Sequence, residues 1–506
     1  MEKSRIKRAK FNMIWLLVYE VVLFASNLVL PKLIISTFGS EYNGIIGSIT
    51  QFLSFVSILR LGVAGATRVS LYKSLAAGDR RETSSIIRAT EIYMRKIGLI
   101  ILAYIMALVV LYPLLLNSAY GFLNVALLVF AIGIGTFAQY FYGITYKTLL
   151  QADQRLYIAN IIQTVTVILN TVISCVLINL GQSIQIVKLV TAVLFVLNPI
   201  VLNKLVIKMY GIDRTVPPDN SALSRRWDVM GHSIANIVHE NTDVLVLTLF
   251  CDIKVVSVYS VYHFVVSGLQ RVLNIFTTGA EPVFGSMFAK EESDKVKKNL
   301  GNFEYVIGAF ISVIFSATIL IILPFVTLYT KGVKDIEYVL PMYALVITLA
   351  YAFFCLRSPY VAVVQAAGHY KETKKGAYAE AAINLISSVI LVNFIGIVGT
   401  AVGTLLANVF RTVQYALYVS RRLVKRSPLV YVKLVLWIGF NIAASYLLFN
   451  GFVSEYAAQG WGQWALSGLA IVAGSGVICL LTSLALYRES FRSVLDIALR
   501  MLKLRK

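Results

Sequence analysis

Fourteen long apolar runs follow one another along the chain, and they constrain its fold more than any other feature. Each run is bounded by charged residues or by clusters of Gly, Asn and Ser, and a bilayer is crossed by about 20 apolar residues. Of the 506 residues, 58% are hydrophobic and only 14% are charged. This composition excludes a soluble enzyme. It predicts an all-α polytopic membrane protein with fourteen transmembrane helices, at residues 11–38, 44–72, 93–116, 119–147, 155–179, 184–209, 227–251, 255–285, 300–330, 336–364, 377–394, 396–420, 429–450 and 462–487.

The basic residues are distributed unevenly between the connections. Lys and Arg total 46 against 25 for Asp and Glu. With both termini on one side, that side carries 36 of the 46, the opposite loops carry five, and five lie within spans. Because cytoplasmic segments collect Lys and Arg, we expect both termini to be cytoplasmic. The net charge of +21 then reports topology, and no nucleic-acid partner is expected.

Two cytoplasmic segments alternate basic and apolar residues in the manner of helices that lie on a membrane surface. They are residues 79–96 and residues 489–506. We predict that both segments are interfacial helices that contact the anionic lipids of the inner leaflet.

The sequence repeats itself at an offset of 214 residues. Tyr146 pairs with Tyr360, for example, and Asn170 pairs with Asn384. The offset maps helices 1–6 onto helices 7–12, and since six is even, both halves enter the membrane in the same direction. A parallel repeat of this kind places a cargo site between the halves. The predicted organisation is an N-lobe at 1–210, a C-lobe at 211–426, helices 13 and 14 at 427–488, and a cytoplasmic amphipathic tail at 489–506.

Arginines within spans indicate a cationic cavity, since a charge in a span must face protein or water. Arg60 and Arg271 lie near the middle of helices 2 and 8, and Arg357 and Arg411 lie in the cytoplasmic halves of helices 10 and 12. The planar fork of a guanidinium suits phosphate. We therefore predict that these four arginines bind the cargo. For Arg357 and Arg411, snorkelling to the inner headgroups is the alternative.

Arg68 and Glu281 lie near the cytoplasmic ends of helices 2 and 8, at matching depth in the two repeats. They are predicted to pair as a gate when the cavity is closed to the cytoplasm, although Arg68 could also snorkel to the headgroups.

Helix 7 carries a polar stripe whose side chains recur at steps of three and four, on one helical face. Two of its acidic residues, Glu240 and Asp243, are three apart and can reach one point, with His239 beside them. Together with Glu20 in helix 1, they are predicted to couple transport to a cation, Na⁺ or H⁺. Neutralisation by a neighbouring basic residue and hydrogen bonding between helices are the alternatives for such groups.

The motifs of soluble catalysis are missing from the sequence. There is no Walker A sequence, no G-x-S-x-G or H-E-x-x-H, and no Cys/His spacing of a metal site. A transporter that is not an enzyme, with no cofactor and no resident metal, is the expectation.

Three stretches resemble bacterial polysaccharide flippases. They are residues 38–82, FGSEYNGIIGSITQFLSFVSILRLGVAGATRVSLYKSLAAGDRRE, the basic start followed by Phe11 and Trp15, and the tract Gln151–Arg155. The family belongs to the multidrug/oligosaccharidyl-lipid/polysaccharide exporter superfamily. The resemblance implies two six-helix lobes around a central cavity in a bacterial cytoplasmic membrane. It also implies that an undecaprenyl-pyrophosphate-linked oligosaccharide is flipped to the outer leaflet. A cation-coupled multidrug exporter and a lipid II flippase are the alternatives within the superfamily.

Overall fold

The computed structural model describes residues 2–60, 63–116, 121–219, 221, 241–290 and 292–503. Throughout these ranges the regular structure is helical. The contacts divide the chain into two compact units, Met1–Ser257 (unit 1) and Val258–Lys506 (unit 2). Large apolar side chains such as Leu447 and Phe394 are about four-fifths exposed (81% and 79%), as expected for a surface that contacts lipid rather than water.

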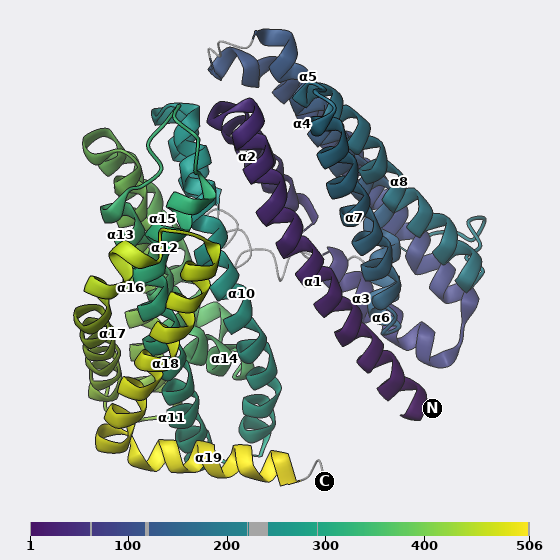
Figure 1. Ribbon diagram of the computed structural model, residues 1–506. Coiled ribbons are helices and arrows are strands. Elements are labelled where there is room, and N and C mark those ends of the chain that lie inside the picture. Colours follow the sequence, from purple (N-terminus) through teal and green to yellow (C-terminus); the bar gives the residue numbers. More distant parts are fainter. Residues whose placement is uncertain are drawn as a thin grey trace. The chain divides into compact units, whose positions relative to one another are not determined.

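Unit 1 is a bundle of long helices that lie side by side (Figure 1). Gly39, with φ of 89°, separates the first two helices, because a positive φ at the turn favours a residue without Cβ. The helices are α1 (Glu2–Phe38), α2 (Ser40–Ser54), η1 (Phe55–Arg60), α3 (Val63–Ala77), α4 (Arg80–Leu116), α5 (Phe122–Ala138), η2 (Gln139–Gly143), α6 (Ile144–Ala152), α7 (Tyr157–Asn179), α8 (Ile184–Tyr210) and the helix Asn241–Phe250.

Unit 2 has the same helical character, and its last helix runs crosswise at one end of the others (Figure 1). Its elements are α10 (Ile253–Ala289), which begins in unit 1, α11 (Ser293–Phe310), η4 (Ile311–Phe315), α12 (Ser316–Tyr329), α13 (Pro341–Leu356), α14 (Ser358–Ala366), α15 (Tyr370–Ile395), α16 (Ile397–Tyr418), η5 (Val419–Leu423), α17 (Leu429–Tyr456), α18 (Trp461–Leu486) and α19 (Arg488–Lys503).

Eleven helices of the described ranges are long and apolar enough to cross a membrane. They correspond to eleven of the fourteen predicted spans. The predicted spans at 255–285 and 396–420 form α10 and α16, which are long but carry more polar residues. Of the predicted span 227–251, residues 227–240 lie outside the described ranges, and Asn241–Phe250 is a short apolar helix. The chain therefore has an all-helical, multi-pass membrane fold.

Two predicted spans are interrupted near an arginine rather than continuous. The span predicted at 44–72 changes from α2 to the 3₁₀ segment η1, which ends at Arg60, before α3 begins at Val63. In the span predicted at 336–364, Arg357 separates α13 from α14, and Pro359 near the start of α14 cannot donate a backbone hydrogen bond to α13. A short 3₁₀ stretch within a span often marks a hinge.

Residues 79–96, predicted to form an amphipathic surface helix, are helical but are not a separate element. They form the first half of α4, which continues to Leu116 without a break. Ile86 and Ile87 are buried in a core with Leu71, Tyr146 and Leu149. The apolar residues of this segment thus pack against protein. The C-terminal tail also packs on its own unit, since Asn302 Nδ2 of α11 donates to Ser493 Oγ of α19 at 2.9 Å.

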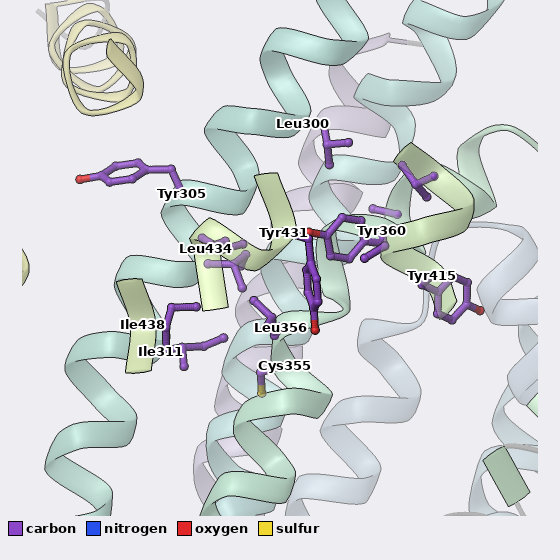
Figure 2. Packing of buried hydrophobic residues seen from close by; sticks show 14 of the residues in the cluster. Leu300, Tyr305, Ile311, Cys355, Leu356, Tyr360, Tyr415, Tyr431, Leu434 and Ile438 are labelled. Atoms are coloured by element: carbon purple, nitrogen blue, oxygen red, sulfur yellow. The ribbon is translucent and has the colours of Figure 1, made fainter. Parts of the chain in front are cut away.

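A core cluster of unit 2 brings α11, α13, α14, α16 and α17 together. Figure 2 shows the rings of Tyr360 and Tyr431 within it, which meet edge to face with centroids 6.0 Å apart. Aromatic pairs favour this geometry. Trp437 is also fully buried here and donates from its indole nitrogen to Thr482 Oγ1 at 2.9 Å, so α18 is joined to the same core.

The helix pairing within the two units follows the sequence repeat. In unit 1, α8 packs against α5 and α7. In unit 2, α16 packs against α13 and α15, which are the counterparts of α5 and α7 at the offset of 214.

Candidate functional site

Two of the four predicted cavity arginines, Arg60 and Arg271, lie midway along predicted spans. Arg60 is the last residue of η1, where the second span is interrupted. Arg271 lies halfway along α10, and its side chain is exposed. A guanidinium midway along a membrane-spanning helix is costly unless protein or water surrounds it.

The other two, Arg357 and Arg411, meet at one buried carboxylate. Arg357 forms an ion pair with Glu380 Oε1, and Arg411 Nε lies 3.4 Å from Glu380 Oε2. Arg411 is only 1% exposed. It donates one hydrogen bond to the carbonyl of Thr373 at 3.0 Å and another to the Tyr415 hydroxyl at 2.8 Å. Two cations thus share one acid, and the cluster keeps one net positive charge inside unit 2.

The predicted gate residues lie in different units. Arg68 is half-buried on α3 of unit 1, and Glu281 is half-buried on α10 of unit 2. Thr67, beside Arg68, is fully buried and is hydrogen-bonded to Thr90 at 3.1 Å, so α3 is fixed against α4.

The predicted ion-coupling residues are only partly within the described ranges. His239 and Glu240 lie outside them. Asp243 is 5% exposed on the helix Asn241–Phe250, whereas Glu20 is exposed on α1.

Unit 1 encloses a cavity of about 430 Å³ between α1, α2, α5, α7 and α8. Lys188 is the only charged residue of its lining. The remaining polar lining is rich in amides, namely Asn27, Asn43, Gln139, Gln163, Asn170 and Asn198.

Each unit also contains a buried acid–arginine contact that sequence reasoning missed. In unit 1, Glu91 is 2% exposed, and Arg214 Nη2 lies 2.9 Å from it and from the Tyr146 hydroxyl. Burial alone would lower the pKa of Arg214, but the hydrogen bond to Tyr146 and the charge of Glu91 outweigh it and raise that pKa. Arg214 therefore remains a cation.

In unit 2, Arg426 binds both oxygens of Glu304 in a bidentate pair whose side chains are 5% and 3% exposed. Tyr360 lies close enough to interact electrostatically with both residues. The two contacts are repeat counterparts, because Tyr146 and Tyr360 are 214 residues apart. The signal in the sequence was one acid near the start of each of two spans, Glu91 just before the span at 93–116 and Glu304 within the span at 300–330.

A set of hydrogen bonds joins α2 to residues 241–257, and we refer to it as the polar seam. At one end, Asn43 Nδ2 donates to Ser257 Oγ at 2.7 Å. These two residues are themselves repeat counterparts, 214 apart. The other bonds link Ser48 to Thr248 at 2.8 Å, and Gln51 and Ser54 to Asn241 Oδ1.

Solved structures of membrane transporters share this fold. The lipid II flippase MurJ in an inward closed conformation matches with a TM-score of 0.67 and 16% identity over 94% of this chain and 99% of that one. An inward-facing MATE family multidrug transporter of the MOP superfamily matches with a TM-score of 0.60 and 14% identity over 80% and 94%. A variant of the Vibrio cholerae MATE transporter VcmN matches with 0.56 and 14% over 84% and 99%.

The chain thus has the fold of MOP-superfamily transporters. No family model and no curated protein sequence matches it. At identities of 14–16% the likeness concerns the fold alone, and the cargo has to be inferred from the residues of the site.

Proposed function

We propose that the protein is a flippase that moves an undecaprenyl-pyrophosphate-linked oligosaccharide from the inner to the outer leaflet of a bacterial cytoplasmic membrane. In this proposal it has fourteen transmembrane helices and cytoplasmic termini, and it works by alternating access. It is a transporter and not an enzyme. The polymer pathway is that of a cell-surface polysaccharide.

The observation that carries the proposal is the exposed Arg271 halfway along α10. A pyrophosphate cannot enter hydrocarbon without compensating positive charge. Arg271 and Arg60, at mid-span positions, would contact the pyrophosphate. Arg357 and Arg411, with one net positive charge after pairing with Glu380, would add to the positive potential.

The interrupted spans support the same proposal. Transporters commonly bind cargo where a transmembrane helix is discontinuous, because free backbone groups are available there. Arg60 ends such an interruption and Arg357 separates two helices. Both cations therefore lie where the backbone can also change direction during transport.

Substitution of Arg271 tests the proposal in a strain that depends on this protein for polymer export. We expect Arg271→Ala to abolish export while the amount of protein in the membrane stays normal, and Arg271→Lys to retain part of it. Arg80→Ala, at an exposed residue at the start of α4, is the matched control and should export normally. Normal export by Arg271→Ala, together with drug efflux, would favour the multidrug exporter. If Arg271→Ala exports polymer precursors normally but no longer translocates lipid II, the lipid II flippase is favoured.

A further inference from the structure

A pocket of about 360 Å³ at the end of α8 in unit 1 is lined mainly by cations. Arg95 of α4, Lys204 and Lys208 of α8, and Arg214 after α8 border it, together with Tyr142 and Asn203. None of the four arginines that the proposed transport uses lines this pocket.

The positive charge here exceeds what the local acid can balance. Glu91 is in contact with Arg88 at 3.6 Å, Arg95 at 2.7 Å and Arg214 at 2.9 Å. Three guanidinium groups thus share one carboxylate. The side chains of Arg95 and Arg214 are still 37% and 40% exposed, so both can accept a further partner.

Lys204 and Lys208 add two more charges at the rim. Both side chains are exposed, and neither forms an ion pair with any residue that the structure describes. The side-chain oxygen of Asn203, by contrast, accepts from Arg214 at 3.3 Å and helps to orient that guanidinium toward the pocket.

Unit 2 provides an internal comparison. Its counterpart contact, Glu304 with Arg426, is one acid with one arginine and is almost fully buried. At the offset of 214, Arg95 corresponds to Ala309 and Lys204 to Tyr418, whereas Lys208 corresponds to another basic residue, Arg422. Joining the helices at this place in the fold therefore requires only a single balanced pair. Arg95 and Lys204, which have no basic counterpart in unit 2, call for another explanation.

The position of the pocket along the helices indicates how deep in the membrane its ligand lies. Arg95 lies near the start of the apolar part of α4, and Lys204 lies near the end of the apolar part of α8. Basic residues at the ends of apolar runs lie at the level of the lipid headgroups. Arginine forks and lysine ammonium groups together suit a phosphate at that level.

We propose that this pocket binds the phosphate of a membrane lipid. The phosphate is that of an anionic phospholipid or the pyrophosphate of a polyprenyl lipid, which present the same chemistry at the same depth. Arg95 and Arg214 donate to its oxygens, while Glu91 holds both guanidinium groups in place. Lys204 and Lys208 supply further positive charge at the rim.

Native mass spectrometry of the purified full-length protein tests the proposal. The probes are phosphatidylglycerol, undecaprenyl pyrophosphate and, as the zwitterionic comparison, phosphatidylcholine. The variant Lys204→Gln with Lys208→Gln removes two rim charges and leaves the contacts of Glu91 intact. The control variant, Lys297→Gln with Lys298→Gln, removes two exposed charges from α11 of unit 2.

We expect an anionic lipid to bind more tightly than phosphatidylcholine, and the rim variant to bind it about tenfold or more weakly. The control variant should bind like the unchanged protein. Whichever anionic probe binds more tightly identifies the source of the phosphate. Equal weakening in both variants, no weakening in the rim variant, or equal binding of phosphatidylcholine would each overturn the proposal.

Discussion

The polar seam allows a sharp test of alternating access through one glycine. A Cβ atom built on Gly44 would lie 2.1 Å from the carbonyl oxygen of Ile253 and 3.0 Å from its carbonyl carbon. Both atoms belong to the backbone, so no side-chain rotation can relieve the clash. Gly44→Ala therefore forces α2 and the start of α10 apart by about 1 Å.

Overpacking of this kind typically costs about 1–3 kcal/mol. If the clash exists only while the seam is closed, the whole cost falls on that state. The ratio of open to closed seam should then rise about 5- to 150-fold, since about 1.4 kcal/mol corresponds to a factor of ten.

Labelling of a cysteine in the seam measures this ratio. Ser257 is fully buried in the closed seam, where it accepts the hydrogen bond from Asn43. In a background without the four native cysteines, Ser257→Cys should react with a maleimide several-fold faster when Gly44 is replaced by Ala.

Gly47→Ala is the matched control. Its Cβ would lie 3.6 Å from a methyl group of Val256, which is an ordinary contact. The two glycines lie on the same helix, so both changes raise helix propensity alike. Equal labelling rates for the two alanine variants would refute the argument that the close approach at Gly44 controls the seam.

Three further predictions concern other residues. Glu304→Gln should lower the free energy of unfolding by about 3–5 kcal/mol, because it leaves Arg426 buried without its acid, and thermal unfolding in detergent would detect the loss. Asp243→Asn should make transport in proteoliposomes independent of the cation gradient while cargo binding persists; transport that still follows the gradient would contradict the coupling role. Exchanging the charges of Arg68 and Glu281 should restore export lost in either single variant, and failure to do so would count against the gate.

The apolar pattern was sufficient to predict where most helices lie, but not where they are interrupted. Eleven predicted spans correspond to helices that can cross a membrane, because twenty apolar residues leave few alternatives to a helix in a bilayer. The interruptions at Arg60 and Arg357 depend on tertiary packing and on local backbone geometry. A window average of hydropathy does not register a single 3₁₀ turn.

The buried pairs were missed for a different reason. Glu91 and Arg214 are 123 residues apart in the sequence, and no local pattern links them. A comparison of the two halves of the sequence could have linked Glu91 with Glu304, since each precedes the span that ends near a buried tyrosine, Tyr146 or Tyr360. Their offset, however, is 213 rather than 214, so a comparison at one fixed offset passes over the match.

The chemistry of the contacts indicates which of them can open during transport. The polar seam consists of hydroxyl and amide hydrogen bonds, four of which link the side chains described above. Each exchanges for bonds to water at a net cost of about 0.5–1.5 kcal/mol, which gives about 2–6 kcal/mol in all. Moving an equilibrium from 1:99 to 99:1 takes about 5.5 kcal/mol, so differential binding of a cargo is sufficient to open such a seam. Breaking the buried ion pair of Glu304 and Arg426 would leave two desolvated charges unpaired. Unit 2 should therefore remain intact around that pair while the seam opens and closes.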